Sequence, residues 1–177
     1  MYTRRGDRGE TSLYGSKRVA KDSPRVEACG SIDEVSSMLG VAISLSNDAK
    51  TSASLREIQK MLFVAGADCA AEYGVSKKVP RISTSNTLRL EKMTDDLVER
   101  LPTLRNFILP GGTPMGAYLQ LSRAVCRRAE RRLRTASQAE KMNPNLLPFF
   151  NRLSSYLFNL SRWANKKAGR KEDVWKG

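Results

Sequence analysis

Apolar residues recur at helical spacing in five stretches of the chain, which are separated by short polar segments or by segments containing glycine or proline. Recurrence at i, i+3, i+4 and i+7 is typical of helices that bury one face. The pattern predicts helices over residues 26–45, 52–73, 85–101, 115–137 and 145–167. No segment shows the apolar–polar alternation of a half-buried strand. We therefore expect an all-α protein, an up-down bundle of five helices with no sheet.

Several residues near the ends of these ranges match helix start and stop signals. Ser31 and Glu34 have the S-x-x-E spacing of a capping box, which would start the first helix at Ser31. Residues 47–48 interrupt the apolar pattern, Gly74 is a typical stop for the second helix, and Pro102 ends the third.

The chain is long enough for one hydrophobic core and shows no internal repeat. Its 177 residues include 40% hydrophobic residues, which indicates a folded protein. We expect a single domain over residues 1–177, with a polar N-terminal loop at 1–24 and a mobile, charged tail at 168–177. Trp175 is unusual in that tail, where it either packs on the bundle or contacts a ligand.

The charge of the chain favours anionic partners. Lysine and arginine total 31 against 18 acidic residues, a net charge of +13. Nucleotides, nucleic acid and a membrane surface all fit such a charge, and so does a basic surface with no partner. No apolar run reaches the roughly 20 residues that span a bilayer. Because the chain also begins without the apolar core of a signal peptide, we expect a cytoplasmic protein.

The residues with catalytic or metal-binding potential are few. The chain has no histidine, the commonest general base and transition-metal ligand. Its three cysteines, Cys29, Cys69 and Cys126, lie far apart without the spacing of a metal site, and we interpret them as buried thiols. No nucleophile–base pair is evident. An enzyme with this composition would work by positioning and charge stabilisation, with the reactive group on a substrate or cofactor.

Residues 2–18 are the segment best suited to hold phosphate groups. Glycines allow the backbone to approach a ligand closely, and hydroxyl and cationic side chains donate hydrogen bonds. Asp7 and Glu10 could hold a magnesium ion that accompanies a polyphosphate. The segment contains no Walker motif. It is therefore either a nucleotide polyphosphate site or a flexible basic arm.

Arginines dominate one face of the fourth predicted helix. Arg123, Arg127, Arg131 and Arg134 share that face, and Glu130 is the only acidic residue beside them. The face is either solvated or lies near an anionic group. Phosphates, or carboxylates such as Asp33 and Glu34 of the first helix, would supply that charge.

Polar residues also interrupt the apolar pattern of the fifth predicted helix. Asn151 and Ser155 share one face of it. A buried amide without a partner costs about 1–3 kcal/mol. Either a ligand or a neighbouring backbone group therefore has to satisfy Asn151.

Seven blocks of the sequence together resemble the ATP:cob(I)alamin adenosyltransferases, in particular the trimeric five-helix-bundle type found in propanediol utilisation. The blocks are T-R-R-G-D-R-G-E-T-S-L-Y-G (3–15), K-R-V-A-K-D-S-P-R-V-E-A (17–28), G-S-I-D-E-V (30–35), Q-K-M-L-F-V-A-G (59–66), F-I-L-P-G-G-T (107–113), C-R-R-A-E-R (126–131) and N-R-L-S-S-Y-L-F (151–158). They follow the family order and cover nearly the whole chain.

This resemblance implies a fold, a reaction and an assembly. The bundle would be ferritin-like, and Co(I) of a reduced corrinoid would attack the 5′ carbon of ATP to give adenosylcobalamin and triphosphate. Magnesium would accompany ATP. The protein would be a homotrimer with active sites at subunit interfaces, and it would act with a reductase and an adenosylcobalamin-dependent client enzyme. Membranes and nucleic acids are not expected partners.

The resemblance also implies roles for particular residues. The N-terminal loop and Lys17 would wrap the triphosphate, through Thr3, Arg4, Gly6, Asp7, Gly9, Thr11, Ser12 and Lys17. Arg127, Arg128 and Glu130 would bind ATP, with Arg127 countering the charge of the leaving phosphates, and Asn151 would hold the nucleotide. No resident metal site is implied.

Three further residues would shape the corrinoid side of the site. Asp33 and Arg123 would form an ion pair across the subunit boundary. Phe107 would press on the lower face of the corrin and keep its dimethylbenzimidazole off, which makes Co(II) easier to reduce.

The chain departs from the family pattern at Ser155, where Asp is common, and at residues 35–36, where the pattern is Leu-Asn. These changes could shift affinity or preference among corrinoids. The alternative function is a basic helical module that binds nucleic acid, which would bind with steep salt dependence. Few aromatic residues are available to stack on bases, which disfavours this alternative.

Overall fold

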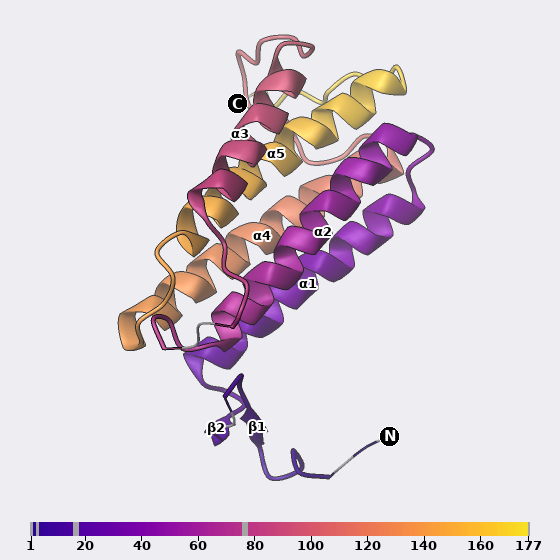
Figure 1. Ribbon diagram of the computed structural model, residues 1–177. Helices are drawn as coiled ribbons and strands as arrows, with labels where there is room; N and C mark the ends of the chain where they lie inside the picture. The colour runs from indigo at the N-terminus through magenta and orange to yellow at the C-terminus, as the bar shows by residue number, and fades with distance from the viewer. Residues whose placement is uncertain (1, 3, 16–17, 76–77, 177) are drawn as a thin grey trace.

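The protein is a bundle of five helices, as the sequence predicts (Figure 1). The computed structural model describes residues 2, 4–15, 18–75 and 78–176. The helices are α1 (Pro24–Ser44), α2 (Ala49–Ala70), α3 (Thr84–Val98), α4 (Pro114–Ala139) and α5 (Leu146–Lys167). α4 packs against both α1 and α5, α2 pairs with α1, and α3 pairs with α5. None of the helices in the described residues is both long and apolar enough to cross a membrane.

A small hairpin precedes the bundle, where the sequence pattern predicted no strand. β1 (Glu10–Ser12) pairs antiparallel with β2 (Arg18–Ala20), with Thr11 opposite Val19. Each strand has only three residues, which is too short for the apolar–polar alternation of a strand to be recognised in the sequence. The hairpin lies beyond the end of the bundle at which α1 begins (Figure 1).

The first helix begins earlier than the proposed capping box, and that prediction was wrong. Ser23 caps the helix with extended backbone, and Pro24 occupies the first turn. Proline suits that position because its fixed φ is helical and its missing N–H would have no partner there. Ser31 instead lies inside α1, where its Oγ donates to the backbone oxygen of Glu27 at 2.9 Å.

The core is built from apolar side chains of all five helices. Phe149 and Phe150 are fully buried, and their rings meet edge to face with centroids 5.4 Å apart. Such contacts add about 0.5–1.5 kcal/mol to the burial of the rings. Other large buried side chains are Ile32, Leu39, Leu55, Ile58, Leu62, Ile82, Leu90, Leu119, Leu133 and Leu146.

A buried carboxylate fastens α2 to the connectors that lead into α3 and α5. Asp68, which is 2% exposed, accepts hydrogen bonds from Arg81 Nη1 at 2.7 Å, Ile82 N at 2.9 Å and Asn143 Nδ2 at 2.6 Å. Charge-assisted bonds of this kind are about twice as strong as neutral ones. This network holds the end of the bundle near the hairpin.

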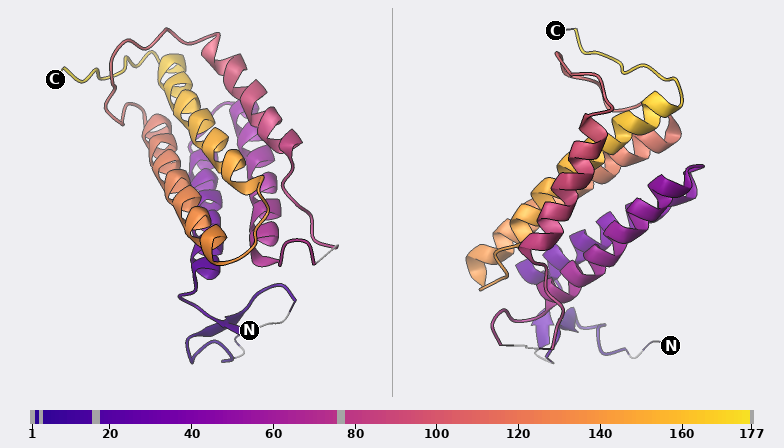
Figure 2. Two further views of the ribbon diagram at one scale, coloured as in Figure 1. Left: turned by 90° about the vertical axis from the view of Figure 1, so that its left-hand side faces the viewer. Right: turned by 45° about the horizontal axis from the view of Figure 1, so that its top comes forward.

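A second polar network holds the opposite end of the bundle. Asn165 of α5 accepts from Thr113 N and Thr113 Oγ1, both at 2.9 Å, and its Nδ2 donates to Gly111 O at 3.0 Å. These bonds attach the α3–α4 connector to α5, and Figure 2 shows that connector and the C-terminal tail at the same end of the molecule. Gly112 allows the required turn because its φ is +101°.

Candidate functional site

The N-terminal segment is a folded arm rather than an extended chain. Lys21 N donates to Gly9 O at 2.8 Å, which closes the turn onto the hairpin. Tyr14 N donates to Ala70 O at 3.2 Å, so the arm is attached to the last turn of α2. Arg18 pairs with Glu10 at 3.1 Å. This pair occupies one of the two carboxylates that the sequence offered for magnesium and leaves Asp7 exposed.

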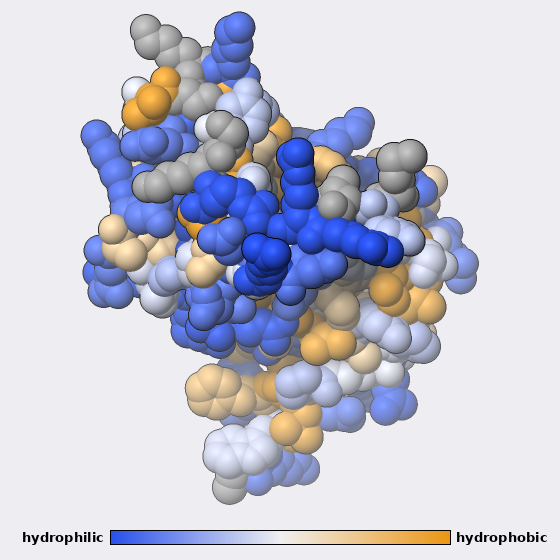
Figure 3. Space-filling model, turned by 90° about the horizontal axis from the view of Figure 1, so that it is seen from below, coloured by the Kyte–Doolittle hydropathy of each residue, from blue (hydrophilic) through white to orange (hydrophobic). Residues whose placement is uncertain are grey.

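The predicted phosphate-binding residues of the arm lie at an accessible surface. Arg4, Asp7, Gly9 and Ser12 are exposed, and Gly6 and Thr11 are half-buried. Thr3 and Lys17 lie outside the described residues. Hydrophilic residues dominate the face of the molecule seen from this end (Figure 3).

A polar pocket between α4 and α5 brings together three of the predicted nucleotide-binding residues. The pocket, of about 330 Å³, is lined by Arg127, Glu130, Arg131, Arg134, Leu147 and Asn151. Asn151 Nδ2 donates to Glu130 Oε1 at 3.0 Å. Arg127, Glu130 and Asn151 thus line the same pocket within one subunit. The pocket contains three arginines beside one carboxylate.

Arg128 points to a different neighbour. Its guanidinium forms an ion pair with Glu34 of α1. Arg132, one turn further along α4, lies 3.5 Å from Glu27, which is two turns earlier in α1. Two of the six arginines of α4 are therefore paired with carboxylates of α1. The unpaired cationic face is the one that includes Arg127.

A larger pocket lies beside the α3–α4 connector and is more apolar. It has a volume of about 710 Å³ and is lined by Leu104, Arg105, Asn106, Phe107, Ile108, Pro110, Gln120, Arg123, Phe158 and Trp175. Phe107 and Trp175 remain 81% and 56% exposed. Large aromatic side chains left open at a pocket are typical of binding surfaces for flat apolar groups.

Arg123 is positioned at the wall of this apolar pocket. Its Nε donates to Gln120 Oε1 at 2.8 Å, and Gln120 Nε2 in turn donates to Ser161 Oγ at 2.9 Å. Burial, and then the positive charge of Arg127, lower the pKa of Arg123 from its ordinary value. A negative group brought to this wall would relieve both effects.

The two pockets lie one helical turn apart on α4. Arg123 lines the apolar pocket and Arg127 lines the polar one. Residues four positions apart in a helix share a face and are separated by a rise of about 6 Å. A ligand with a polyphosphate at Arg127 and a ligand with a broad apolar face at Phe107 can therefore be adjacent.

The C-terminal tail lines part of the apolar pocket through Trp175, whose partner in the α3–α4 connector the sequence analysis left open. Trp175 N donates to Phe107 O at 2.9 Å and Leu109 N donates to Asp173 O at 2.8 Å. Within the same tail, Glu172 accepts from Arg162 Nε at 2.6 Å. The presence of a tryptophan in a charged tail was the signal that could have located this contact.

Asp33 and Arg123 form no ion pair with each other within one subunit. It is exposed on α1, and among the described residues it forms no ion pair in this chain. An arginine partner for Asp33 would have to come from a second subunit, so the pair predicted across a subunit boundary stays a prediction.

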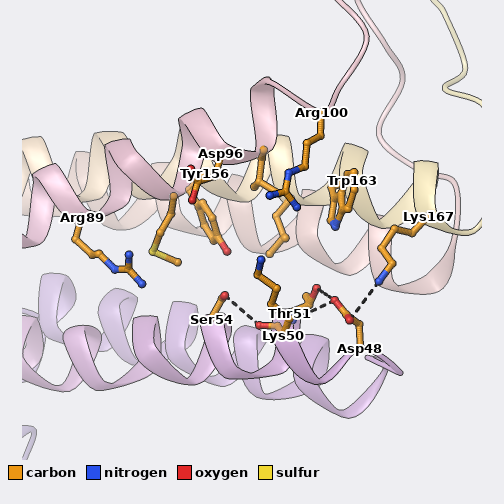
Figure 4. A pocket seen from close by; sticks show the side chains of 13 residues that line it. Asp48, Lys50, Thr51, Ser54, Arg89, Asp96, Arg100, Tyr156, Trp163 and Lys167 are labelled. Carbon is orange, nitrogen blue, oxygen red and sulfur yellow. Dashed lines mark hydrogen bonds and ion pairs between the residues drawn. The ribbon is translucent and has the colours of Figure 1, made fainter.

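A separate cleft between α2 and the α3–α5 pair contains none of the predicted site residues that the structure describes (Figure 4). An ion pair of Asp48 with Lys167, at 3.2 Å, closes one end. Tyr156 points into the cleft, and burial raises its pKa to about 12.

Within the described residues there is no cluster of three or more potential metal-binding side chains. The sequence matches a family of known proteins. The family model described as cobalamin adenosyltransferase matches residues 1–164. The chain belongs to the cobalamin adenosyltransferase family.

Individual relatives agree with this assignment. A corrinoid adenosyltransferase from Mycobacterium leprae is 43% identical over 173 residues, covering 93% of this chain and 91% of the relative. A corrinoid adenosyltransferase from Citrobacter freundii is 36% identical, covering 92% and 93%.

Solved structures of the family share the whole fold. A variant PduO-type ATP:corrinoid adenosyltransferase from Lactobacillus reuteri, complexed with cobalamin and ATP, superposes with a TM-score of 0.95 at 34% identity over 99% of both chains. A second variant of that enzyme, complexed with ATP, has a TM-score of 0.93 at 35% identity over 99% of this chain and 100% of the other.

Proposed function

We propose that this protein transfers the 5′-deoxyadenosyl group of ATP to Co(I) of a reduced corrinoid. The observation that carries the proposal is the adjacency of a polar arginine pocket and an open aromatic pocket along one turn of α4. Relatives named corrinoid adenosyltransferases, and the related structure complexed with both cobalamin and ATP, support this pairing of ligands.

The proposed reaction requires no nucleophile from the protein. The electron pair of Co(I) forms a bond to C5′ of ATP, the bond from C5′ to oxygen breaks, and triphosphate leaves with that electron pair. Cobalt ends as Co(III). The absence of histidine from the chain fits this mechanism, since no protein imidazole can replace the lower ligand of the corrinoid.

The polar pocket would stabilise the leaving group. Arg127 would counter the negative charge that develops on the triphosphate, because a guanidinium can donate two parallel hydrogen bonds to phosphate oxygens. The hydrogen bond from Asn151 to Glu130 would fix the orientation of both side chains towards the nucleotide. Arg128, which pairs with Glu34, would contribute by exchanging this partner for a phosphate.

The arm would enclose the triphosphate and position its magnesium ion. Thr3, Lys17 and the exposed donors of the arm would hold the phosphates, and Asp7 is the free carboxylate that fits magnesium. One or two carboxylates together with phosphate oxygens are the usual set for this ion. Bound there, magnesium would neutralise phosphate charge.

The apolar pocket would receive the corrinoid. Phe107, held by backbone pairing to Trp175, would cover the lower face and exclude both water and the dimethylbenzimidazole. Removing a lower ligand makes Co(II) easier to reduce. The Co(I) itself has to come from a one-electron reductase, and the product would pass to an adenosylcobalamin-dependent enzyme.

The assembly would be a homotrimer with its sites between subunits. Asp33 is exposed and free to pair with Arg123 of a second copy. α1 and α4 also leave apolar side chains exposed, such as Val41, Tyr118 and Leu121. Covering these in a subunit contact would be favourable at about 25 cal/mol per Å². Sedimentation equilibrium should therefore report three chains per particle.

Substitution of Arg127 tests the proposed reaction directly. Arg127→Ala should lower the rate of adenosylcobalamin formation by about 100-fold or more, because one charge-stabilising donor to a leaving group is lost. Formation of the cobalt–carbon bond is followed by absorbance with ATP, magnesium and chemically reduced cobalamin. Arg89→Ala removes the same charge from α3, outside both pockets, and should leave the rate unchanged.

Equal rates for the Arg127→Ala variant and the wild type would overturn the assigned role. Binding to nucleic acid is the competing function raised by the charge. The named relatives do not support it, and tight RNA binding without cobalt–carbon bond formation would be needed to restore it.

A further inference from the structure

Two cysteines that lie 40 positions apart in the sequence come into contact in the structure. Cys29, near the start of α1, and Cys69, in the last turn of α2, have their sulfur atoms 3.1 Å apart. A disulfide bond is about 2.0 Å long, so the two sulfurs need to approach by only about 1 Å to form one. Neither residue takes part in the proposed adenosyl transfer.

We propose that Cys29 and Cys69 form an oxidisable thiol pair, which low-molecular-weight disulfides such as oxidised glutathione convert into an intramolecular disulfide. The pair is a modification site that is independent of the proposed function. It would add a covalent link between two helices that are joined at this level by hydrogen bonds from Arg25.

The surroundings give the two thiols different roles. Cys29 is half-buried and accessible to a small oxidant, whereas Cys69 is fully buried. The hydrogen bond between the two thiols and the charge of Arg25 lower the pKa of Cys29 despite its partial burial. The same hydrogen bond and fuller burial raise the pKa of Cys69. Since the thiolate is the nucleophile, Cys29 reacts first.

The chemistry then proceeds in two exchanges. The Cys29 thiolate attacks one sulfur of the oxidant disulfide and releases one thiolate. With Cys29 capped, its negative charge no longer opposes ionisation of Cys69. Cys69 passes its proton to the released thiolate and attacks Cys29 Sγ. This attack expels the second half of the oxidant as a thiolate, which takes up the proton that Cys29 lost. The protein loses two hydrogen atoms, and the oxidant is reduced to two thiols.

The disulfide would form directly beneath the nucleotide arm. Tyr14 N donates to Ala70 O at 3.2 Å, next to Cys69. Arg25 Nη1 donates to both Cys69 O and Ala71 O at 3.2 Å, so the beginning of α1 is already hydrogen-bonded to the end of α2. A covalent link at this point would therefore hold the start of α1 and the end of α2, to which the arm is attached, in a fixed relative position.

The test treats the purified full-length protein with oxidised glutathione and follows its intact mass, its peptide map and its thermal unfolding. The expected product has lost two hydrogen atoms, contains a Cys29–Cys69 peptide link and regains them with dithiothreitol. Cross-linking residues so far apart in sequence should raise the Tm by roughly 5 °C.

Two variants separate this outcome from nonspecific oxidation. Cys126→Ser should behave as the wild type, because Cys126 is buried with its thiol donating to Phe150 O at 3.4 Å and burial raises its pKa. Cys69→Ser keeps Cys29 but removes its partner, and should stop at a glutathione adduct with no rise in Tm. A wild-type protein that stops at the same adduct, stays unreacted or links through Cys126 would overturn the proposal.

Discussion

The contact between Gly116 and Asn165 gives the most quantitative prediction about how the fold positions the site. A methyl group added at Gly116 would overlap Asn165 Oδ1 and lie 2.8 Å from Asn165 Cγ, closer than such atoms approach in proteins. Gly116→Ala therefore has to displace the amide that holds the α3–α4 connector against α5.

The magnitude follows from the bonds that the amide makes. Displacing Asn165 breaks its bonds with Thr113 N, Thr113 Oγ1 and Gly111 O, all in a partly buried setting. Leaving such groups without partners costs about 1–3 kcal/mol each, although nearby water recovers part of this. Alanine in place of glycine returns up to about 1 kcal/mol of helix propensity. We expect a net loss of about 2–4 kcal/mol.

Urea unfolding of a double-mutant cycle measures this contribution. Gly116→Ala in the Asn165→Ala background has no amide to displace, so it should cost nothing or stabilise α4 slightly. The coupling free energy between the two positions should then be about 3 kcal/mol, at the upper end of measured cycles.

The matched control is Gly66→Ala, a helical glycine whose added methyl would lie 4.0 Å from Ile32 Cγ2, an ordinary contact. It should raise the free energy of unfolding by roughly 0.5–1 kcal/mol. The argument fails if Gly116→Ala costs as much without the Asn165 amide as with it.

Three other changes test separate parts of the structure. Asp68→Ala removes the buried carboxylate that Arg81, Ile82 N and Asn143 share, although Arg81 and Asn143 keep backbone acceptors. Urea unfolding should show a loss of about 3 kcal/mol, and a loss under 1 kcal/mol would contradict the network. Phe107→Ala should slow reduction of bound Co(II) without changing ATP affinity, and its 81% exposure predicts little change in stability; equal damage to ATP binding would contradict its role. Tyr156 has a folded pKa of about 12 against about 10 unfolded, so its contribution is complete below pH 10 and falls as pH rises towards 12. At pH 11 the wild type should therefore have lost about 1.4 kcal/mol that Tyr156→Phe retains, and identical pH profiles of the two proteins would exclude this cause.

The helices could be predicted from sequence because each buries one face, and burial leaves a local period. α5 was placed within one residue of its observed start, since Leu153, Leu157 and Leu160 repeat at helical spacing. The capping box was misplaced because Ser31 and Glu34 have the local spacing of one. The helix in fact begins at Pro24, where proline suits the first turn.

The candidate site was predictable only in part, for the same reason. Arg127 and Glu130 share a face by spacing alone, but their contact with Asn151 depends on how α5 packs on α4. The pairing of Trp175 with Phe107 and the approach of Cys29 to Cys69 join segments distant in sequence. Contacts of this kind produce no repeating pattern of apolar residues, so they cannot be predicted from a single sequence.

The measurement that tests the central claim most directly is the identity of both products formed by the purified wild-type protein from ATP and Co(I) cobalamin. Attack at C5′ predicts one adenosylcobalamin for each inorganic triphosphate released. Release of diphosphate or monophosphate instead, or triphosphate without a cobalt–carbon bond, would contradict the account.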